Sequence, residues 1–201
     1  MVKLKKDTKN NLKQLGWGLL AALAVFVVSN FNYLWQNVKY SFVKPVPIVV
    51  DTRPHPQGEP DTLIIPSLGI TAPVKYAQGN TEPELQKLLL DGVVHYAGTA
   101  GPGQTGNDYI FGHSSDYVFS TGHYKTVFAL LPKIQIGDSV LITDSSGNLF
   151  TYKVSATKVV SPSDLSVLSQ QTNGQKILTV QTSYPVGTAL KRFVAICELV
   201  E

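Results

Sequence analysis

Three short segments of this sequence carry side chains suited to moving protons and charge. His113 follows Gly112 in the run IFGHSS, Ser183 lies in the run QTSYPVGT, and Arg192 comes nine residues later. An imidazole can exchange a proton near neutral pH, and a serine hydroxyl can attack a carbonyl carbon once a base takes its proton. A guanidinium can hydrogen-bond a developing oxyanion. These residue types can act together only if the fold brings their segments to one place.

Other chemistries have less support in the residues. Cys197 is the only cysteine, so the chain cannot form an internal disulfide or a multi-thiolate metal site. No His, Asp and Glu cluster has metal-ligand spacing, and we expect neither a metal nor a cofactor. The Gly-rich stretch 98–106 fits no phosphate-loop spacing, so it is predicted to be a turn.

The charge of the chain is concentrated at its N-terminus. Residues 1–15 hold five lysines against Asp7, a net of +4, which leaves −1 for the remainder of a chain whose total is +3. A nucleic-acid-binding domain would need a basic face on its folded body, so we expect no nucleic-acid partner. A basic tip beside an apolar run indicates a lipid bilayer as partner instead.

A single membrane-spanning helix is predicted directly after this tip. No residue from Leu15 to Trp35 is charged, and as a helix this stretch measures about 31 Å, the hydrocarbon thickness. The lysines before it predict a cytoplasmic N-terminus and a C-terminal domain outside the cell membrane. A cleaved signal peptide is the alternative, but no small-x-small site follows the apolar core closely, which favours an uncleaved anchor.

Four regions follow from these patterns: a cytoplasmic basic tip (1–15), a transmembrane anchor (16–35), a Pro-rich linker (36–60) and a folded domain (61–201). The prolines of residues 43–60 exclude a helix there, so this part is a stiff spacer or an edge strand. Asp51 and Arg53 are candidates to lie near a groove, and His55 is expected to be solvated.

The folded domain has a β pattern with little helix. Runs rich in Val, Ile, Thr, Tyr and Phe predict strands at 62–65, 70–74, 108–111, 139–143, 150–160, 176–181 and 192–200. A helix is predicted at 82–91, capped by Thr81, and short helices are possible at 124–131 and 163–169. Many short strands and few helices favour a closed all-β barrel over a parallel α/β fold.

Three motifs in this order resemble the sortase family of membrane-anchored cysteine transpeptidases. They are LIIPSLGI at 63–70, GNDYIFGHSS at 106–115 and TSYPVGT followed by Arg192. The resemblance covers roughly 61–201. It implies an eight-stranded barrel that cuts an LPxTG-type C-terminal sorting signal and passes the acyl group to an amine of the cell wall or of a pilin.

The resemblance also implies the catalytic residues. His113 matches the family's histidine, Arg192 matches its arginine, and Ser183 occupies the position where the family has its nucleophilic cysteine. A serine hydroxyl is far more basic than a thiol, so activity should be weak, altered or lost. Asp116 is near His113 in sequence, which does not by itself establish contact.

Three interpretations of Ser183 stay open: a weakened sortase-type transpeptidase or peptidase, a non-catalytic sortase-fold protein that binds sorting signals, and an engineered Cys→Ser variant of an active sortase. Cys197 is not expected to replace the missing thiol, because on a regular strand it shares a face with Phe193 and Ala195, opposite Arg192.

Further residues are candidates for binding substrate. Thr182 precedes the nucleophile position, Tyr184 begins a turn that shapes the groove wall, and His95 precedes the Gly-rich loop with a packing or hydrogen-bonding role. The region 161–174 before the nucleophile strand is short, so we expect no elaborate substrate-binding helix there. His123, in a Ser-Thr-Gly turn, is predicted to be at the surface.

Overall fold

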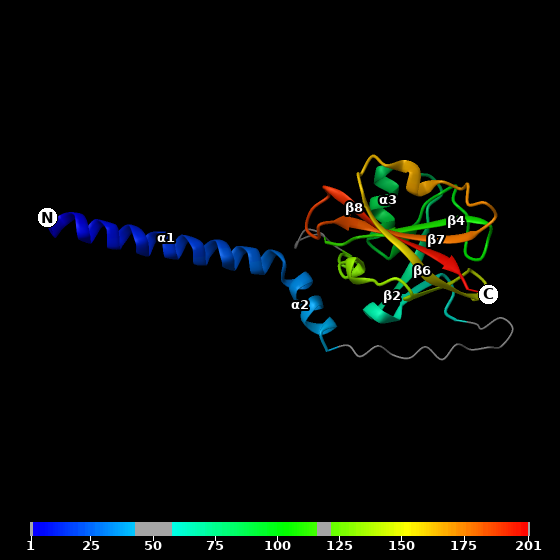
Figure 1. The fold of residues 1–201 in the computed structure, drawn as a ribbon, viewed down its shortest axis with the longest axis horizontal. Coiled ribbons are helices and arrows are strands. Elements are labelled where there is room, and N and C mark those ends of the chain that lie inside the picture. The colour runs from blue at the N-terminus through cyan, green and yellow to red at the C-terminus, as the bar shows by residue number, and fades with distance from the viewer. Residues whose placement is uncertain (1, 43–57, 116–121, 201) are drawn as a thin grey trace.

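The computed structural model describes residues 2–42, 58–115 and 122–200. A long N-terminal helix projects from one end of a β-barrel, and a second, shorter helix turns beside that end (Figure 1). The helices are α1 (Val2–Ser29), α2 (Phe31–Tyr40) and α3 (Glu82–Leu89), with 3-10 turns η1 (Pro66–Leu68), η2 (Leu131–Lys133) and η3 (Leu165–Leu168). The strands are β1 (Thr62–Ile65), β2 (Ile70–Tyr76), β3 (Val93–His95), β4 (Gly106–Gly112), β5 (Ser139–Thr143), β6 (Leu149–Val160), β7 (Lys176–Tyr184) and β8 (Lys191–Leu199).

The eight strands close into a barrel in the order β1-β2-β3-β4-β7-β8-β6-β5. β2 with β3 and β4 with β7 are parallel pairs, and the other neighbours are antiparallel. The parallel pairing of β4 with β7 brings together two segments far apart in sequence. It also aligns their C-terminal ends, where two of the predicted catalytic residues lie.

The interior of the barrel is filled by alternate residues of each strand. On β8, Phe193, Ala195 and Cys197 point into the core, as the alternation of a strand requires. The largest fully buried side chains are Tyr152, Phe128, Leu63, Ile65, Ile110, Leu131, Ile142 and Leu178. Because this interior is packed with side chains, any site must lie on the outer wall or at an end.

The predicted all-β barrel with few helices is confirmed, and β1 and β5 have the predicted bounds. β3 was not predicted, because its three residues are too few to show a period. The helix predicted at 82–91 is α3, although the Thr81 side chain makes no capping hydrogen bond. Of the second candidate, residues 125–130 form turns and Leu131 begins the 3-10 turn η2. Only Leu165–Leu168 of the third candidate are helical, as the 3-10 turn η3.

The N-terminal region differs in detail from its prediction. One helical stretch among the described residues, Asn10–Ser29, is long and apolar enough to cross a membrane. The helix breaks at Asn30, and α2 then extends through residues 36–40 of the predicted linker. The linker residues Asp51, Arg53 and His55 lie outside the described residues.

A polar pair is buried inside the barrel. The side chains of His95 on β3 and Asp108 on β4 point inward, with His95 Nε2 at 3.6 Å from Asp108 Oδ1. Neither Asp108 oxygen has a hydrogen-bond partner within the described part of the chain. Burial raises the pKa of Asp108 well above its usual value and lowers the pKa of His95. Burial in the barrel therefore favours the neutral form of each group.

This pair gives a prediction for stability. A carboxyl whose pKa is raised in the folded state stabilises the fold fully below its unfolded pKa, and that stabilisation is lost as pH rises. We expect the free energy of unfolding of the unmodified chain, relative to Asp108→Asn, to fall as pH rises above about 4. Urea titrations of both proteins at pH 4 and 8 measure it. Parallel profiles would show that Asp108 ionises normally.

Candidate active site

Strand register gathers the three predicted catalytic residues at one end of the barrel. Ser183 on β7 pairs directly with Arg192 on the antiparallel neighbour β8. On the other side of β7, Thr182 pairs with Gly112 at the end of β4, so His113 follows beside Ser183. Directly opposed residues share a face, with Cβ atoms about 5 Å apart. The register therefore puts Ser183 between His113 and Arg192.

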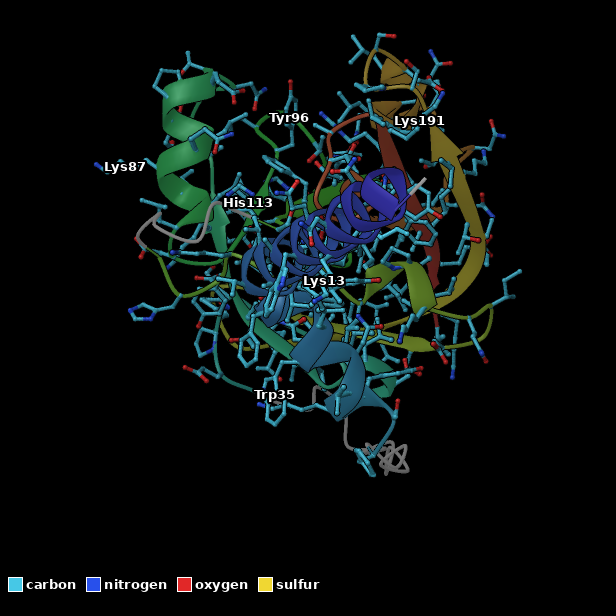
Figure 2. All side chains as sticks on the ribbon, turned by 90° about the vertical axis from the view of Figure 1, so that its left-hand side faces the viewer. Lys13, Trp35, Lys87, Tyr96, His113 and Lys191 are labelled. Carbon is cyan, nitrogen blue, oxygen red and sulfur yellow. The ribbon has the colours of Figure 1, made fainter. Side chains whose placement is uncertain are left out.

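These residues face the outside of the barrel. Phe193, next to Arg192, points into the core, so Arg192 points outward, and all three predicted catalytic side chains are half-buried. Figure 2 looks along α1 toward the barrel and labels His113 on this side. The β7–β8 loop lies at the same end in Figure 1. The three side chains are therefore partly exposed at the end of the barrel that α1 approaches.

The close packing around Gly112 explains a glycine before His113. A Cβ atom at Gly112 would lie 2.7 Å from the ring of Phe128, which is fully buried. The backbone N–H of Phe128 also donates to the carbonyl of His113 at 2.9 Å. The backbone of His113 is thus held against a core residue, which fixes where its side chain leaves the strand.

A wall of aromatic and polar side chains adjoins the site on the outer face of β4 and β7. Tyr109 and Phe111 alternate with inward residues on β4, and both rings lie edge-on to Tyr96. The Tyr109 hydroxyl donates to Gln181 Oε1, two residues before Ser183. This wall was not predicted from the sequence, although Tyr109, Phe111 and His113 have the spacing of one strand face.

The Arg192 side chain is held close to its own end of the barrel. Its guanidinium donates to the carbonyls of Ala189 and Lys191 at 3.1 Å each. Both acceptors belong to the β7–β8 connection or the first residue of β8, so the cation stays beside the loop that joins it to Ser183.

The three predicted substrate-binding residues point elsewhere. The Thr182 hydroxyl donates to the carbonyl of Gly112 at 2.8 Å and is 1% exposed, so it joins β4 to β7 from inside. Tyr184 packs against the core, with its ring 6.2 Å from that of Phe193. His95 is buried in the barrel, where its Nε2 lies 2.9 Å from the carbonyl of Ala100. Their arrangement supports positioning of the site, while substrate contact by these residues stays a prediction.

The single cysteine lies away from this site. Cys197 is five residues beyond Arg192 on β8, about 17 Å along the strand. Its side chain is fully buried, and burial raises the pKa of its thiol to about 12. A thiol without solvent access or thiolate character cannot attack a peptide carbonyl at the outer face.

The burial of Cys197 gives a direct prediction. We expect the folded chain not to react at pH 8 with an aromatic disulfide that releases a coloured thiolate on reaction with a protein thiol. One equivalent of the coloured thiolate per chain should be released only after denaturation. The reagent's absorbance, followed with and without guanidinium, measures both. Fast reaction of the folded protein would show that the thiol reaches solvent.

A closed eight-stranded β-barrel in which β7 lies between β4 and β8 is the fold typical of sortases. Residues 63–200 match the family model of the sortase domain. The chain therefore belongs to the sortase family, as the motifs predict.

Relatives agree with this assignment. The chain is 29% identical over 135 residues to sortase D of Bacillus subtilis, covering 66% of this chain and 59% of that protein, which is less than two thirds of its length. A Clostridium perfringens sortase D5 transpeptidase structure is 27% identical with a TM-score of 0.57, covering 74% of this chain and 83% of that one. A mutant of sortase E from Streptomyces avermitilis is 28% identical with a TM-score of 0.54, covering 73% of this chain and 91% of that one.

Proposed function

We propose that this protein recognises C-terminal sorting signals of LPxTG type at the outer face of its barrel and transfers or hydrolyses the acyl group slowly. The observation that carries the proposal is the strand register that sets Ser183 between His113 and Arg192. The family membership and the Clostridium perfringens transpeptidase support it. The position of Ser183 is where the family resemblance requires a cysteine.

The proposed reaction gives a separate role to each of the three side chains, Ser183, His113 and Arg192. The Ser183 hydroxyl attacks the threonine carbonyl of the signal while His113 takes its proton. Arg192 hydrogen-bonds the oxyanion that forms. The bond to glycine breaks, the leaving amine takes the proton from His113, and an ester to Ser183 remains. An amine of the cell wall or of a pilin then attacks this ester, with water as the hydrolytic alternative.

The replacement of a thiol by a hydroxyl makes the first step slow. A thiol of pKa ~8.5 can be ionised by a neighbouring cation, whereas a hydroxyl needs a general base in the transition state. Binding of the signal depends on contacts with the surrounding surface rather than on this one atom. A non-catalytic protein that holds sorting signals is therefore the second candidate, and an engineered Cys→Ser variant of an active sortase is the third. The native codon at position 183 identifies that last case.

Location follows from the N-terminal helix. We place residues 1–9, with four of the N-terminal lysines, in the cytoplasm, Asn10–Ser29 within the cell membrane as a single span, and the barrel outside, where cell-wall or pilin amines are available. The barrel then lies in the compartment that holds both of its proposed substrates, the sorting signal and the acceptor amine.

Binding without a persistent adduct is the expected result for the unmodified chain. We expect an LPxTG-type peptide to bind the full chain in detergent, and intact-mass spectra to show no stable ester at Ser183. Scrambled peptide and Ser183→Ala are the controls, and Ser183→Ala should bind equally well. Absence of binding would contradict sorting-signal recognition, and a lasting adduct at Ser183 would contradict the non-catalytic alternative.

A further inference from the structure

The helix α2 exposes its apolar side chains. Phe31, Trp35 and Val38 on α2, and Phe42 just beyond it, are about half exposed or more, at 57%, 49%, 50% and 81%. Their spacing of four, three and four residues places them on one face. Phe31 and Trp35 stack with parallel rings at a centroid distance of 6.3 Å. A helix of a soluble domain normally buries its apolar face against the core, whereas this helix exposes its apolar face to solvent.

The opposite face of α2 is fixed to the barrel by polar and aromatic contacts. Gln36 Nε2 donates to Thr126 Oγ1 at 2.6 Å, and Lys133 Nζ lies 4.6 Å from the ring centre of Tyr40. Tyr40 also packs against the hydrophobic core. The exposed apolar face is thus held in a defined orientation by the barrel.

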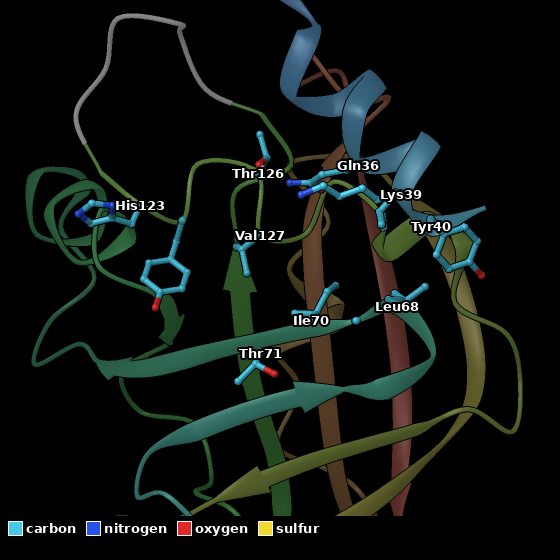
Figure 3. Close-up of a pocket in the computed structure, with 12 residues that line it drawn as sticks. Gln36, Lys39, Tyr40, Leu68, Ile70, Thr71, His123, Thr126 and Val127 are labelled. Atoms are coloured by element: carbon cyan, nitrogen blue, oxygen red, sulfur yellow. Dashed lines mark hydrogen bonds between the residues drawn. The ribbon is translucent and has the colours of Figure 1, made fainter. Parts of the chain in front are cut away.

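A cleft of about 280 Å³ lies between this inner face and the barrel. Figure 3 shows Gln36, Lys39 and Tyr40 above it, with barrel residues beneath: Leu68, Ile70 and Val127. The helix therefore touches the barrel through a few side chains rather than through a continuous apolar interface, and its larger apolar side chains remain on the outside.

This apolar face continues the proposed membrane span. Only Asn30 separates α2 from α1, and the chain turns sharply there, so α2 runs beside the end of the barrel that faces α1 (Figure 1). Lys39 Nζ lies 5.5 Å from the ring centre of Trp35, which puts a cation beside an exposed aromatic ring. Trp, Phe and Lys together are typical of helices at the boundary between lipid and water.

The same junction contacts the active-site end. A Cβ atom at Gly187, in the β7–β8 loop, would lie 3.6 Å from Asn30 Oδ1. The backbone N–H of Gly187 donates to Ser115 Oγ at 3.1 Å, two residues after His113. The loop that joins Ser183 to Arg192 therefore lies against the point where the chain leaves α1.

We propose that α2 lies along the outer membrane–water interface, with Phe31, Trp35, Val38 and Phe42 in the lipid, and that it holds the catalytic end of the barrel toward the bilayer. The partner is the lipid bilayer surface, since the face follows a membrane span after one residue. This inference rests on the membrane anchoring proposed above. It adds that the site stands at a fixed height and orientation over the membrane, where a substrate held in the same bilayer reaches it.

Tryptophan fluorescence tests the proposal, because the chain has only two tryptophans, Trp17 and Trp35. The full chain with Trp17→Phe is placed in vesicles of phosphatidylcholine and phosphatidylglycerol brominated at defined acyl-chain depths. We expect Trp35 emission to be blue-shifted and quenched most by bromines near the headgroup end of the chains. A Trp35 emission maximum at the wavelength of a water-exposed tryptophan, without quenching by bromine, would overturn the proposal.

Two matched variants separate the possible failures. Trp35→Phe leaves Trp17 as the reporter of α1, and its quenching shows anchoring independently of α2. A Val200→Trp variant without the other two tryptophans reports the opposite end of the barrel, where β8 ends (Figure 1), and should not be quenched. Quenching of Trp17 with none of Trp35 would overturn only the interfacial helix. A blue shift of Trp35 that depends on protein concentration and not on bromine depth would indicate a second copy of the chain and also overturn it.

A second readout tests the orientation. In the Ser183→Cys background, Phe31→Ser with Trp35→Ser should lower cleavage of a lipid-tethered LPxTG peptide in the same vesicles several-fold, and leave cleavage of the soluble peptide unchanged. Equal loss for both peptides would mean that the substitutions disturb the site itself, which would overturn the assignment of these side chains to the lipid. No loss for either would overturn the orienting role of α2.

Discussion

The Ser183→Cys variant is expected to cleave an LPxTG-type peptide at least about two orders of magnitude faster than the unmodified chain. A hydroxyl depends on a general base during attack whereas a thiolate does not, and such assistance is commonly worth about 10²-fold or more. The register already places position 183 between His113 and Arg192, so the substitution changes only the attacking atom. A half-buried thiol next to a guanidinium ionises more readily than a hydroxyl. Release of a quenched fluorophore from the peptide measures the rate.

Controls identify the thiol that reacts. Ser183→Cys combined with Cys197→Ala should be as active as Ser183→Cys alone, because Cys197 is buried in the barrel. Cys197 alone, in the unmodified chain, should remain unreactive toward a peptide aldehyde. Failure of Ser183→Cys to gain activity with a library of sorting signals would contradict the inference that the rest of the site is intact.

Loss of Arg192 should have the second largest effect. In the Ser183→Cys background, Arg192→Ala is expected to lower kcat by about 10²–10³-fold, the usual effect of removing one oxyanion donor. The pairing of Ser183 with Arg192 on adjoining strands places the guanidinium beside the attacking atom. Peptide binding should change little, since this interaction is strongest in the transition state.

A conservative variant separates charge from geometry. Arg192→Lys keeps the cation but loses the planar pair of donors that hydrogen-bonds the carbonyls of Ala189 and Lys191. We expect it to keep the alkylation rate of the introduced thiol by iodoacetamide while losing most of kcat. If Arg192→Ala leaves kcat unchanged, the oxyanion role assigned to this residue is wrong.

Much of the barrel was predictable from the sequence. The β-branched and aromatic runs predicted β1 and β5 with their bounds, because each run is bounded by Gly, Pro or Asp. The alternation along 192–197 also predicted the inward position of Cys197, which the core packing confirms. These features depend on local periodicity, which the sequence displays directly.

Other features depend on contacts between distant residues. The three residues of β3 have no period of their own and form a strand because β2 and β4 flank them. The raised pKa of Asp108 depends on burial by the whole barrel, since nothing beside it in sequence distinguishes it from a surface aspartate. The linker region was predicted from its prolines, yet residues 36–40 precede them and fold as helix against the barrel.

The sequence by itself determined the family, the barrel class and the apolar stretch near the N-terminus, and it predicted His113, Ser183 and Arg192 as the candidate catalytic residues. Only the tertiary structure decided which side chains share the outer face of the barrel, and it buried Thr182 and His95 and packed Tyr184 against the core. Only the tertiary structure also showed that α2 keeps its apolar face exposed beside the catalytic end. The physical reason is the same in each case, because strand pairing and burial join residues far apart in the chain, and no local pattern records which partners they meet.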